Sequence, residues 1–176
     1  GSWMSYDRVI MPWDLGLRAR GIVLLGAGQP IVLCAIDWLG ISNEGFDVFR
    51  QTLATAAGTV PERVTVHTLH NHDTPTADFS AEKILLEARL DPRGFDGTFA
   101  REVLRRLDVG VRASLSQAKT VTEIGLGEAE VHDVASSRRI LGPDGKVRAM
   151  RFTTTRDPAI RAEPIGTIDP IVSLVS

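Results

Sequence analysis

Cysteine is nearly absent from this sequence, which contains only Cys34 among its 176 residues. A single cysteine excludes an internal disulfide framework and a cysteine-rich zinc ribbon. No apolar run approaches the ~18–20 residues that a membrane-spanning helix needs. The first five residues also lack the basic segment followed by an apolar stretch that marks a signal peptide. We therefore expect no transmembrane segment and see no export signal, which leaves the compartment open.

The sequence also lacks a strong excess of either charge. Its 20 basic and 22 acidic residues give a net charge of −2. Without a basic surface to meet phosphates, general nucleic-acid binding is disfavoured. The hydrophobic content of 43% is ordinary for a globular protein. A chain of this length buries roughly 70% of its unfolded surface, so folding requires neither a disulfide nor a metal. We expect one domain over residues 1–176.

Hydrophobic patterning predicts a mixed fold. Two short apolar strands, 20–25 and 31–36, flank a glycine-containing turn, and the near-continuous second run is typical of a strand buried on both faces. A helix ending at Gly58 separates them from a further strand, 63–69, and this order favours parallel pairing. Residues 95–118 show helical periodicity. We predict an α/β fold, with α+β as the alternative, in which helices pack on a layered, partly parallel sheet.

The flanking regions are less regular. Residues 1–16 are predicted to form an irregular lead-in over a pocket, and the glycine- and proline-rich segment 142–145 predicts a tight turn. Further strands are expected at 150–155 and 168–175. Because the chain ends inside an apolar, strand-like run, we expect it to be a fragment or to stop before its natural partner segment.

Three of the four histidines lie within six residues, at His67, His70 and His72. If the strand continues as far as residue 72, side chains alternate between its faces, so His70 and His72 share one face and His67 points to the other. Two imidazoles on one face can converge on a metal ion, with nitrogens at ~2.0–2.1 Å. We therefore predict His70 and His72 as metal ligands, with Asp73 and Thr74 available to support them. The simpler reading is a pair of hydrogen-bonded or surface histidines.

Two known His-x-His patterns do not fit. The metallo-β-lactamase pattern, His-x-His-x-Asp-His, places an aspartate one position later than Asp73 and requires another histidine. The amidohydrolase barrels require more histidines and a (β/α)₈ barrel, for which this chain is too short.

Asp37 is the other candidate catalytic residue. It ends the buried strand 31–36, and parallel sheets place functional residues at carboxyl strand ends, where the histidine pair also lies. The alternative is a helix-capping or loop aspartate. His67 is expected to be structural and Cys34 to be a small buried hydrophobe. His132 is isolated in the sequence.

The sequence predicts surface positions for several arginines. Arg138 and Arg139 are expected to lie in an exposed loop, with carboxylate anchoring as the alternative. The arginines of the segment 95–118 are expected to form a solvated helix face.

The order of these pieces resembles the N-terminal catalytic domain of the neutral/alkaline non-lysosomal ceramidase family. That family carries Thr-His-Thr-His-Ser-Gly-Pro where this chain has Leu69-His70-Asn71-His72-Asp73-Thr74-Pro75. The histidine motif is the most specific part of the resemblance. Pattern-level similarity covers four further stretches, residues 17–24, 35–37, 137–139 and 168–174.

The resemblance implies a zinc-dependent amidase that hydrolyses the N-acyl bond of a sphingolipid. The family's first motif histidine is a zinc ligand and corresponds to His70, whereas the second, corresponding to His72, lies at the active site beside it. Zinc-activated water would be the nucleophile. The family's other ligands follow at positions beyond residue 176.

Two histidines alone do not complete a catalytic zinc site, which needs three protein ligands and an open position. Asn71, Asp73 and Thr74 also depart from the family motif. A hydrolase of another amide or ester therefore remains an alternative. So does a non-catalytic, ceramidase-like binding domain, and so does an unrelated hydrolase that uses His70, His72 and His132.

Overall fold

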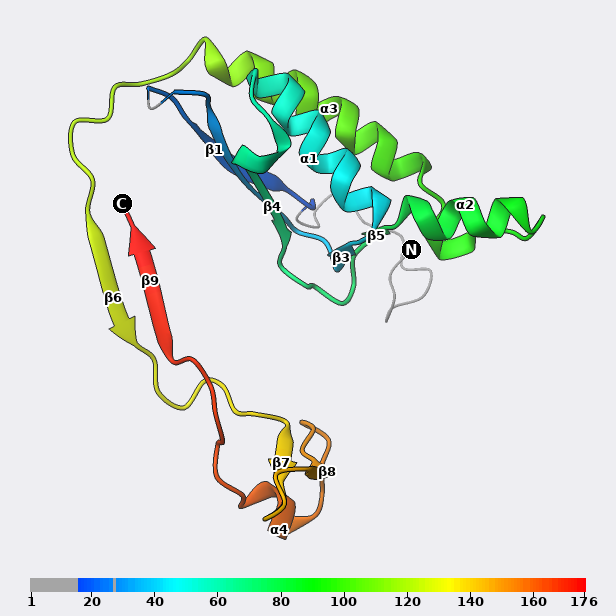
Figure 1. The fold of residues 1–176 in the computed structure, drawn as a ribbon, viewed down its shortest axis with the longest axis vertical. Helices are drawn as coiled ribbons and strands as arrows, with labels where there is room; N and C mark the ends of the chain where they lie inside the picture. The colour runs from blue at the N-terminus through cyan, green and yellow to red at the C-terminus, as the bar shows by residue number, and fades with distance from the viewer. Residues whose placement is uncertain (1–15, 27) are drawn as a thin grey trace. The chain divides into compact units, whose positions relative to one another are not determined.

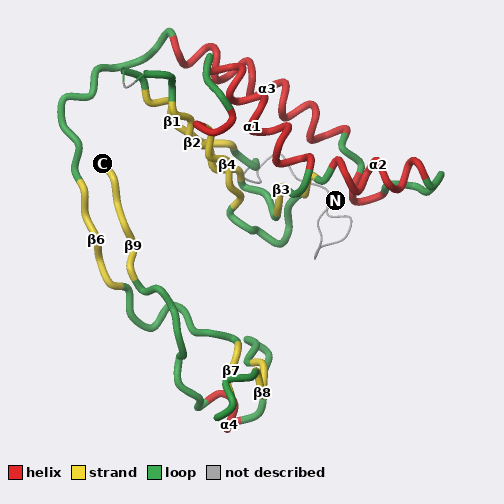
Figure 2. The backbone as a smooth tube through the Cα atoms, viewed as in Figure 1, coloured by secondary structure: helices red, strands yellow, loops and turns green. Residues whose placement is uncertain are grey.

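A computed structural model describes residues 16–26 and 28–176 (Figures 1 and 2). The predicted lead-in at residues 1–16 falls almost entirely outside these described residues. The chain forms two compact units, one up to Lys119 and the other from Thr120 to Ser176. Helices and strands are both present, which confirms the mixed fold class.

The first unit is built on a three-stranded sheet with the strand order β1-β2-β4. Strand β1 (Ala19–Leu24) runs antiparallel to β2 (Ile31–Ile36), and β2 runs parallel to β4 (Val64–Thr68). The predicted strand boundaries are close to those observed. The parallel pairing of β2 with β4, expected from the intervening helix, is confirmed.

Two helices, α1 (Glu44–Ala57) and α3 (Thr98–Leu115), cover one face of this sheet (Figure 1). Gly58 ends α1 in a left-handed conformation with φ 71°, which only glycine adopts without steric cost. Helix α3 begins later than its periodicity predicts because Arg93–Phe95 forms a separate 3-10 turn. The Asp96 carboxylate then accepts a 2.8 Å hydrogen bond from the Thr98 amide.

The core lies between the helices and the covered face of the sheet. Val32, Cys34 and Ile36 alternate along β2 toward this core, where they meet α1. Cys34 is 5% exposed, which confirms the prediction of a small buried hydrophobe, and burial raises the pKa of its thiol to about 11. The prediction that β2 is buried on both faces is wrong for the described residues. Leu33, on the opposite face, stays 39% exposed because neither α1 nor α3 reaches that side.

A buried carboxylate joins α2 (Phe79–Glu87) to the start of α3. Glu82 is 6% exposed and accepts hydrogen bonds from the Gly97 amide, at 2.8 Å, and from the Arg101 guanidinium. Arg101 also lies over the Phe79 ring, 4.9 Å from its centroid. Arg101 stays exposed, as predicted for the solvated face, and at the same time pairs with the buried Glu82. By contrast, Arg105 and Arg112 pair with acids of α3 itself.

Replacing Glu82 with glutamine is expected to remove an acid-sensitive part of the stability. The hydrogen bond from Arg101 is the largest cause that holds the pKa of Glu82 below its usual value. A lowered folded-state pKa stabilises the protein above the unfolded value of about 4.3, and this stabilisation is lost as pH falls through the folded-state pKa. The difference in unfolding free energy between wild type and Glu82→Gln should therefore shrink from pH 6 toward pH 3 in urea titrations.

Glu102→Gln is the matched control for this experiment. Glu102 pairs with Arg105 and Arg106 on the solvent side of α3, where water screens the interaction. The loss of unfolding free energy in Glu102→Gln should be smaller than in Glu82→Gln, because water screens an exposed ion pair. An equal loss at both sites would contradict the structural role assigned to Glu82.

The second unit consists of two hairpin-like pairs. Strand β6 (Leu126–Glu130) pairs with β9 (Ile171–Val175), and β7 (Arg139–Leu141) pairs with β8 (Val147–Met150) around the predicted 142–145 turn. A short helix, α4 (Pro158–Arg161), follows.

The predicted strand 150–155 is wrong, because the chain turns soon after β8. The Phe152 amide donates to the Thr155 hydroxyl, and the Thr155 amide donates back to the Phe152 carbonyl. Throughout the described chain, no helix combines the length and the apolar character needed to cross a bilayer.

Candidate functional site

The carboxyl ends of β2 and β4 lie side by side. Ile36, the last residue of β2, is opposite Thr68, the last residue of β4. Asp37 follows the first of these strands and His70 lies two residues beyond the second. Since parallel strands deliver their following residues to one edge of a sheet, the topology brings the predicted Asp37 and the histidine pair to the same edge.

The chain after β4 does not continue as a strand to residue 72, so the predicted extension of this strand is wrong. His70 has φ 59°, a left-handed conformation that histidine tolerates better than most residues. The amides of Leu69 and His70 donate to the Ile36 and Trp38 carbonyls, at 3.1 and 3.0 Å. These bonds bend the chain toward the residues that follow β2. The relation between the two histidines therefore comes from this bend and not from strand alternation.

The His70 ring is oriented by the main chain. Its Nδ1 lies 3.0 Å from the Leu39 carbonyl oxygen. A carbonyl only accepts, so Nδ1 is the donor in this contact, and in the neutral imidazole the lone pair then lies on Nε2. Protein metal sites commonly use this arrangement, in which one ring nitrogen donates to a backbone carbonyl and the other is available to the metal.

The two imidazoles are adjacent and perpendicular. The ring centroids of His70 and His72 are 4.9 Å apart and the ring planes meet at 81°. Two imidazoles that bind one tetrahedral zinc ion through nitrogens at about 2.1 Å have centroids about 5 Å apart. Both residues are exposed, so solvent has access to the pair. The donor set fits two of the ligands of a zinc ion, and the same geometry also fits edge-to-face ring packing.

Residues that the sequence does not mark as functional hold this loop in place. Trp38 is 2% exposed and packs edge-on against Phe49, with centroids 5.7 Å apart, so the segment that receives His70 is anchored in the core. The Leu39 amide donates to the Pro75 carbonyl, and β3 (Gly40–Ile41) then pairs in parallel with β5 (Thr76–Ala77). The available signal was the apolar Trp-Leu pair directly after Asp37.

Thr74 closes the turn that contains His72. Its hydroxyl is buried and donates a 2.6 Å hydrogen bond to the Asn71 carbonyl. Thr74 was predicted as a group that supports the histidine pair, and its hydroxyl bonds to the main chain of the turn.

Asp37 lies at the same edge, but its carboxylate is engaged on the other side of β2. Its Oδ2 accepts a 3.0 Å hydrogen bond from the Arg18 amide, which precedes β1. Since β1 and β4 flank β2 on opposite sides, this bond fixes the carboxylate on the β1 side of the edge.

The other histidines do not join the pair. His67 lies on the exposed face of β4, opposite the buried side chains of Val64 and Val66. His132 belongs to the second unit, 3.8 Å from the Glu130 carboxylate. Among the described residues, no three histidine, cysteine or acidic side chains are grouped so as to hold a metal ion. The histidine pair is thus a partial ligand set within this part of the chain.

An apolar groove of about 650 Å³ runs between β1 and α3. Its lining includes Leu17 and Ala19 at one end and Leu107, Gly110 and Val111 along the helix. Leu17 and Ala19 flank Arg18, whose amide binds Asp37. One end of the groove therefore lies next to the edge that carries Asp37.

Comparisons of this chain with protein-family models, curated proteins and solved structures found no match. The chemistry of the edge itself is therefore the basis for a functional hypothesis.

Proposed function

We propose that this protein is a zinc-dependent hydrolase, similar to the neutral ceramidases, that cleaves the N-acyl amide bond of a sphingolipid or a related lipid. The observation that carries the proposal is the adjacency of the His70 and His72 imidazoles, 4.9 Å apart at an exposed strand-end edge. The resemblance of the surrounding motif to that family gives the reaction and the substrate class.

The protein's own groups have distinct tasks in this proposal. His70 would hold zinc through Nε2, with the Leu39 carbonyl fixing the tautomer of its ring. His72 would hold the ion beside it. A zinc ion held there would polarise the amide carbonyl and lower the pKa of water toward about 7. Asp37 supplies a carboxylate able to accept a proton at this edge, oriented by the Arg18 amide.

The apolar groove supports a lipid substrate. Its volume of about 650 Å³ is within the roughly 300–1,000 Å³ range of ligand-binding pockets. Aliphatic side chains from both walls, such as Val23 and Leu107, offer an acyl chain a surface that it enters by leaving water. We propose that the acyl chain lies in this groove, with the amide toward Asp37.

Hydrolysis by the full-length protein tests the proposal directly. Fatty-acid release from N-acyl sphingosines should be abolished by a zinc chelator and restored by added zinc. A protein that binds these lipids without turnover would instead be the non-catalytic relative. Chelator-resistant release would rule out the metal mechanism, and cleavage restricted to other amides or esters would replace the sphingolipid by another substrate.

Filling the groove should change the preference for chain length. A Cβ added at Gly110 meets nothing within 4 Å, so Gly110→Phe projects a ring into the groove without a clash at Cβ. We expect kcat/KM for a palmitoyl amide to fall by about tenfold or more relative to an acetyl amide. A tenfold fall corresponds to about 1.4 kcal/mol of apolar contact between the acyl chain and the groove that the ring displaces.

Val109→Phe provides the matched control, because Val109 is an exposed neighbour on α3 that does not line the groove. Its ratio of long-chain to short-chain kcat/KM should stay at the wild-type value. Equal losses for both chain lengths in Gly110→Phe would contradict an acyl site in this groove.

A further inference from the structure

The second unit contains a cavity of its own, about 660 Å³ in volume, that the proposed hydrolase site does not use. Three arginines line it: Arg138, before β7, Arg151, after β8, and Arg161, at the end of α4. These residues are distant in sequence. Their presence around one cavity therefore depends on the fold of this unit.

Arg151 is hydrogen-bonded to the main chain of both other arginines. Its amide donates a 2.8 Å hydrogen bond to the Arg138 carbonyl, and its guanidinium donates to the Arg161 carbonyl. The same guanidinium also donates to the main-chain carbonyls of Ser137, Glu163 and Pro164. The Arg151 guanidinium thus donates to neutral main-chain carbonyls, and these partners do not neutralise its positive charge.

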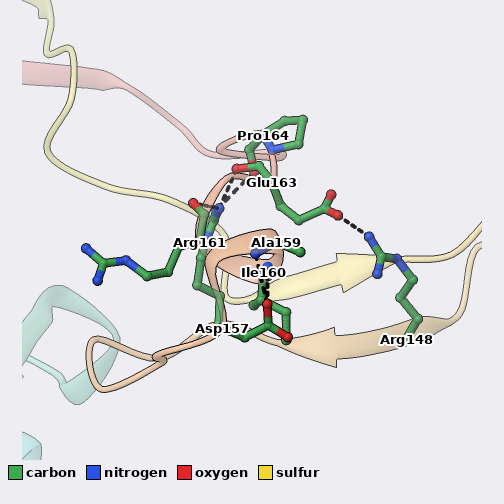
Figure 3. Close-up of polar contacts among 8 residues, drawn as sticks. Arg148, Asp157, Ala159, Ile160, Arg161, Glu163 and Pro164 are labelled. Carbon is green, nitrogen blue, oxygen red and sulfur yellow. Dashed lines mark hydrogen bonds and ion pairs between the residues drawn. The ribbon is translucent and has the colours of Figure 1, made fainter.

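The guanidinium groups of Arg138 and Arg161 have a different status. Within residues 16–26 and 28–176, neither makes a side-chain hydrogen bond or an ion pair with a protein group, and both residues are exposed. Figure 3 shows the Arg161 side chain extending away from the ion pair between Arg148 and Glu163. That ion pair engages one of the two carboxylates that line the cavity, which leaves Asp133 to oppose three arginines.

The remainder of the lining is mixed. Hydroxyl groups of Ser136, Thr153 and Thr155 line the cavity, as do the exposed apolar side chains of Phe152 and Ile165. Guanidinium groups bind planar or tetrahedral oxyanions through paired N–H donors, and hydroxyls add further donors. The apolar side chains provide contact for the body of a ligand larger than an inorganic ion.

From this juxtaposition we propose a second binding site, in which Arg138 and Arg161 hold the oxyanion of a small organic phosphate or carboxylate and Phe152 and Ile165 contact its apolar body. Arg151 is a positioning residue that fixes the backbone of both binding arginines. The site does not depend on zinc or on the histidine pair, so it stands apart from the proposed hydrolase function.

Calorimetric titration of the full-length protein tests the site with three probes of similar size. Phenyl phosphate and benzoate carry the oxyanion, and benzyl alcohol is their neutral counterpart. We expect at least one of the two oxyanions to bind, and the stronger of them identifies phosphate or carboxylate as the ligand group. Arg138→Gln and Arg161→Gln should each raise Kd by about tenfold or more, because each removes a charge-assisted pair of hydrogen bonds.

Arg156→Gln is the matched control, since Arg156 is an exposed arginine of the same unit that does not line the cavity. Its Kd should remain at the wild-type value. The proposal is overturned if neither oxyanion binds, if benzyl alcohol binds as tightly as they do, or if Arg156→Gln weakens binding as much as the cavity variants. Circular dichroism of each variant confirms that the losses are not due to unfolding.

Discussion

Replacing His70 with asparagine is expected to reduce the zinc content of the full-length protein from about one ion per chain to a small fraction of one. Asparagine tolerates the left-handed backbone at φ 59°, and its side-chain amide can donate to the Leu39 carbonyl as Nδ1 does now. The substitution therefore removes the Nε2 donor while retaining the local structure. Metal analysis after dialysis measures the effect.

The same substitution should have the largest effect on activity. Loss of the metal removes several kcal/mol of transition-state stabilisation, so kcat/KM is expected to fall on the order of 10³-fold. His72→Asn should have a comparable effect, because two of the zinc ligands are assigned to this pair.

His67→Asn is the control, because His67 lies on the exposed face of β4 and does not join the pair. It should retain both zinc and activity. Full zinc occupancy in His70→Asn would show that the contact between the two rings is simple edge-to-face packing, and the hydrolase proposal would lose its basis.

Phe49→Ala is expected to cause the largest loss of stability, about 3–5 kcal/mol of unfolding free energy. The Phe49 side chain is 0% exposed and packs edge-on against Trp38, so its removal leaves a cavity at the centre of the core. Because the Trp38 carbonyl also accepts the His70 amide, the loss should loosen the loop that carries the histidines. Urea denaturation gives the change in stability, and zinc affinity reports the change in the loop.

Phe46→Ala separates burial from residue type. Phe46 lies one turn earlier on α1, is 37% exposed and contacts Arg50 at 5.5 Å. Its removal leaves no enclosed cavity, and we expect a loss below about 1 kcal/mol. Similar losses at both positions would mean that Phe49 is less buried in solution than in this structure.

Elements with strong local signals were predictable. The strand 31–36 has the predicted bounds because its apolar run is flanked by turn residues on one side and Asp37 on the other. Gly58 ends α1 where its freedom to adopt positive φ predicts an end. The start of α3 was missed because the apolar periodicity extends backward through Phe95, which belongs to a 3-10 turn.

The candidate site was located for a partly wrong reason. Sequence spacing placed His70 and His72 together by assuming an extended strand, whereas the chain leaves β4 at Thr68 and turns at His70. The positive φ of His70 depends on its hydrogen bonds to Trp38 and Leu39, which lie more than 30 positions away in the sequence. No local pattern contains that information.

By itself, the sequence determined the main strands and helices of the first unit and the positions of the imidazole side chains, since both depend on side-chain chemistry and short-range periodicity. Only the tertiary structure decided the direction of each imidazole, the engagement of Asp37 with Arg18 and the meeting of Arg138 with Arg161 around one cavity. These features arise from hydrogen bonds between distant parts of the backbone, whose partners become neighbours only when the chain has folded.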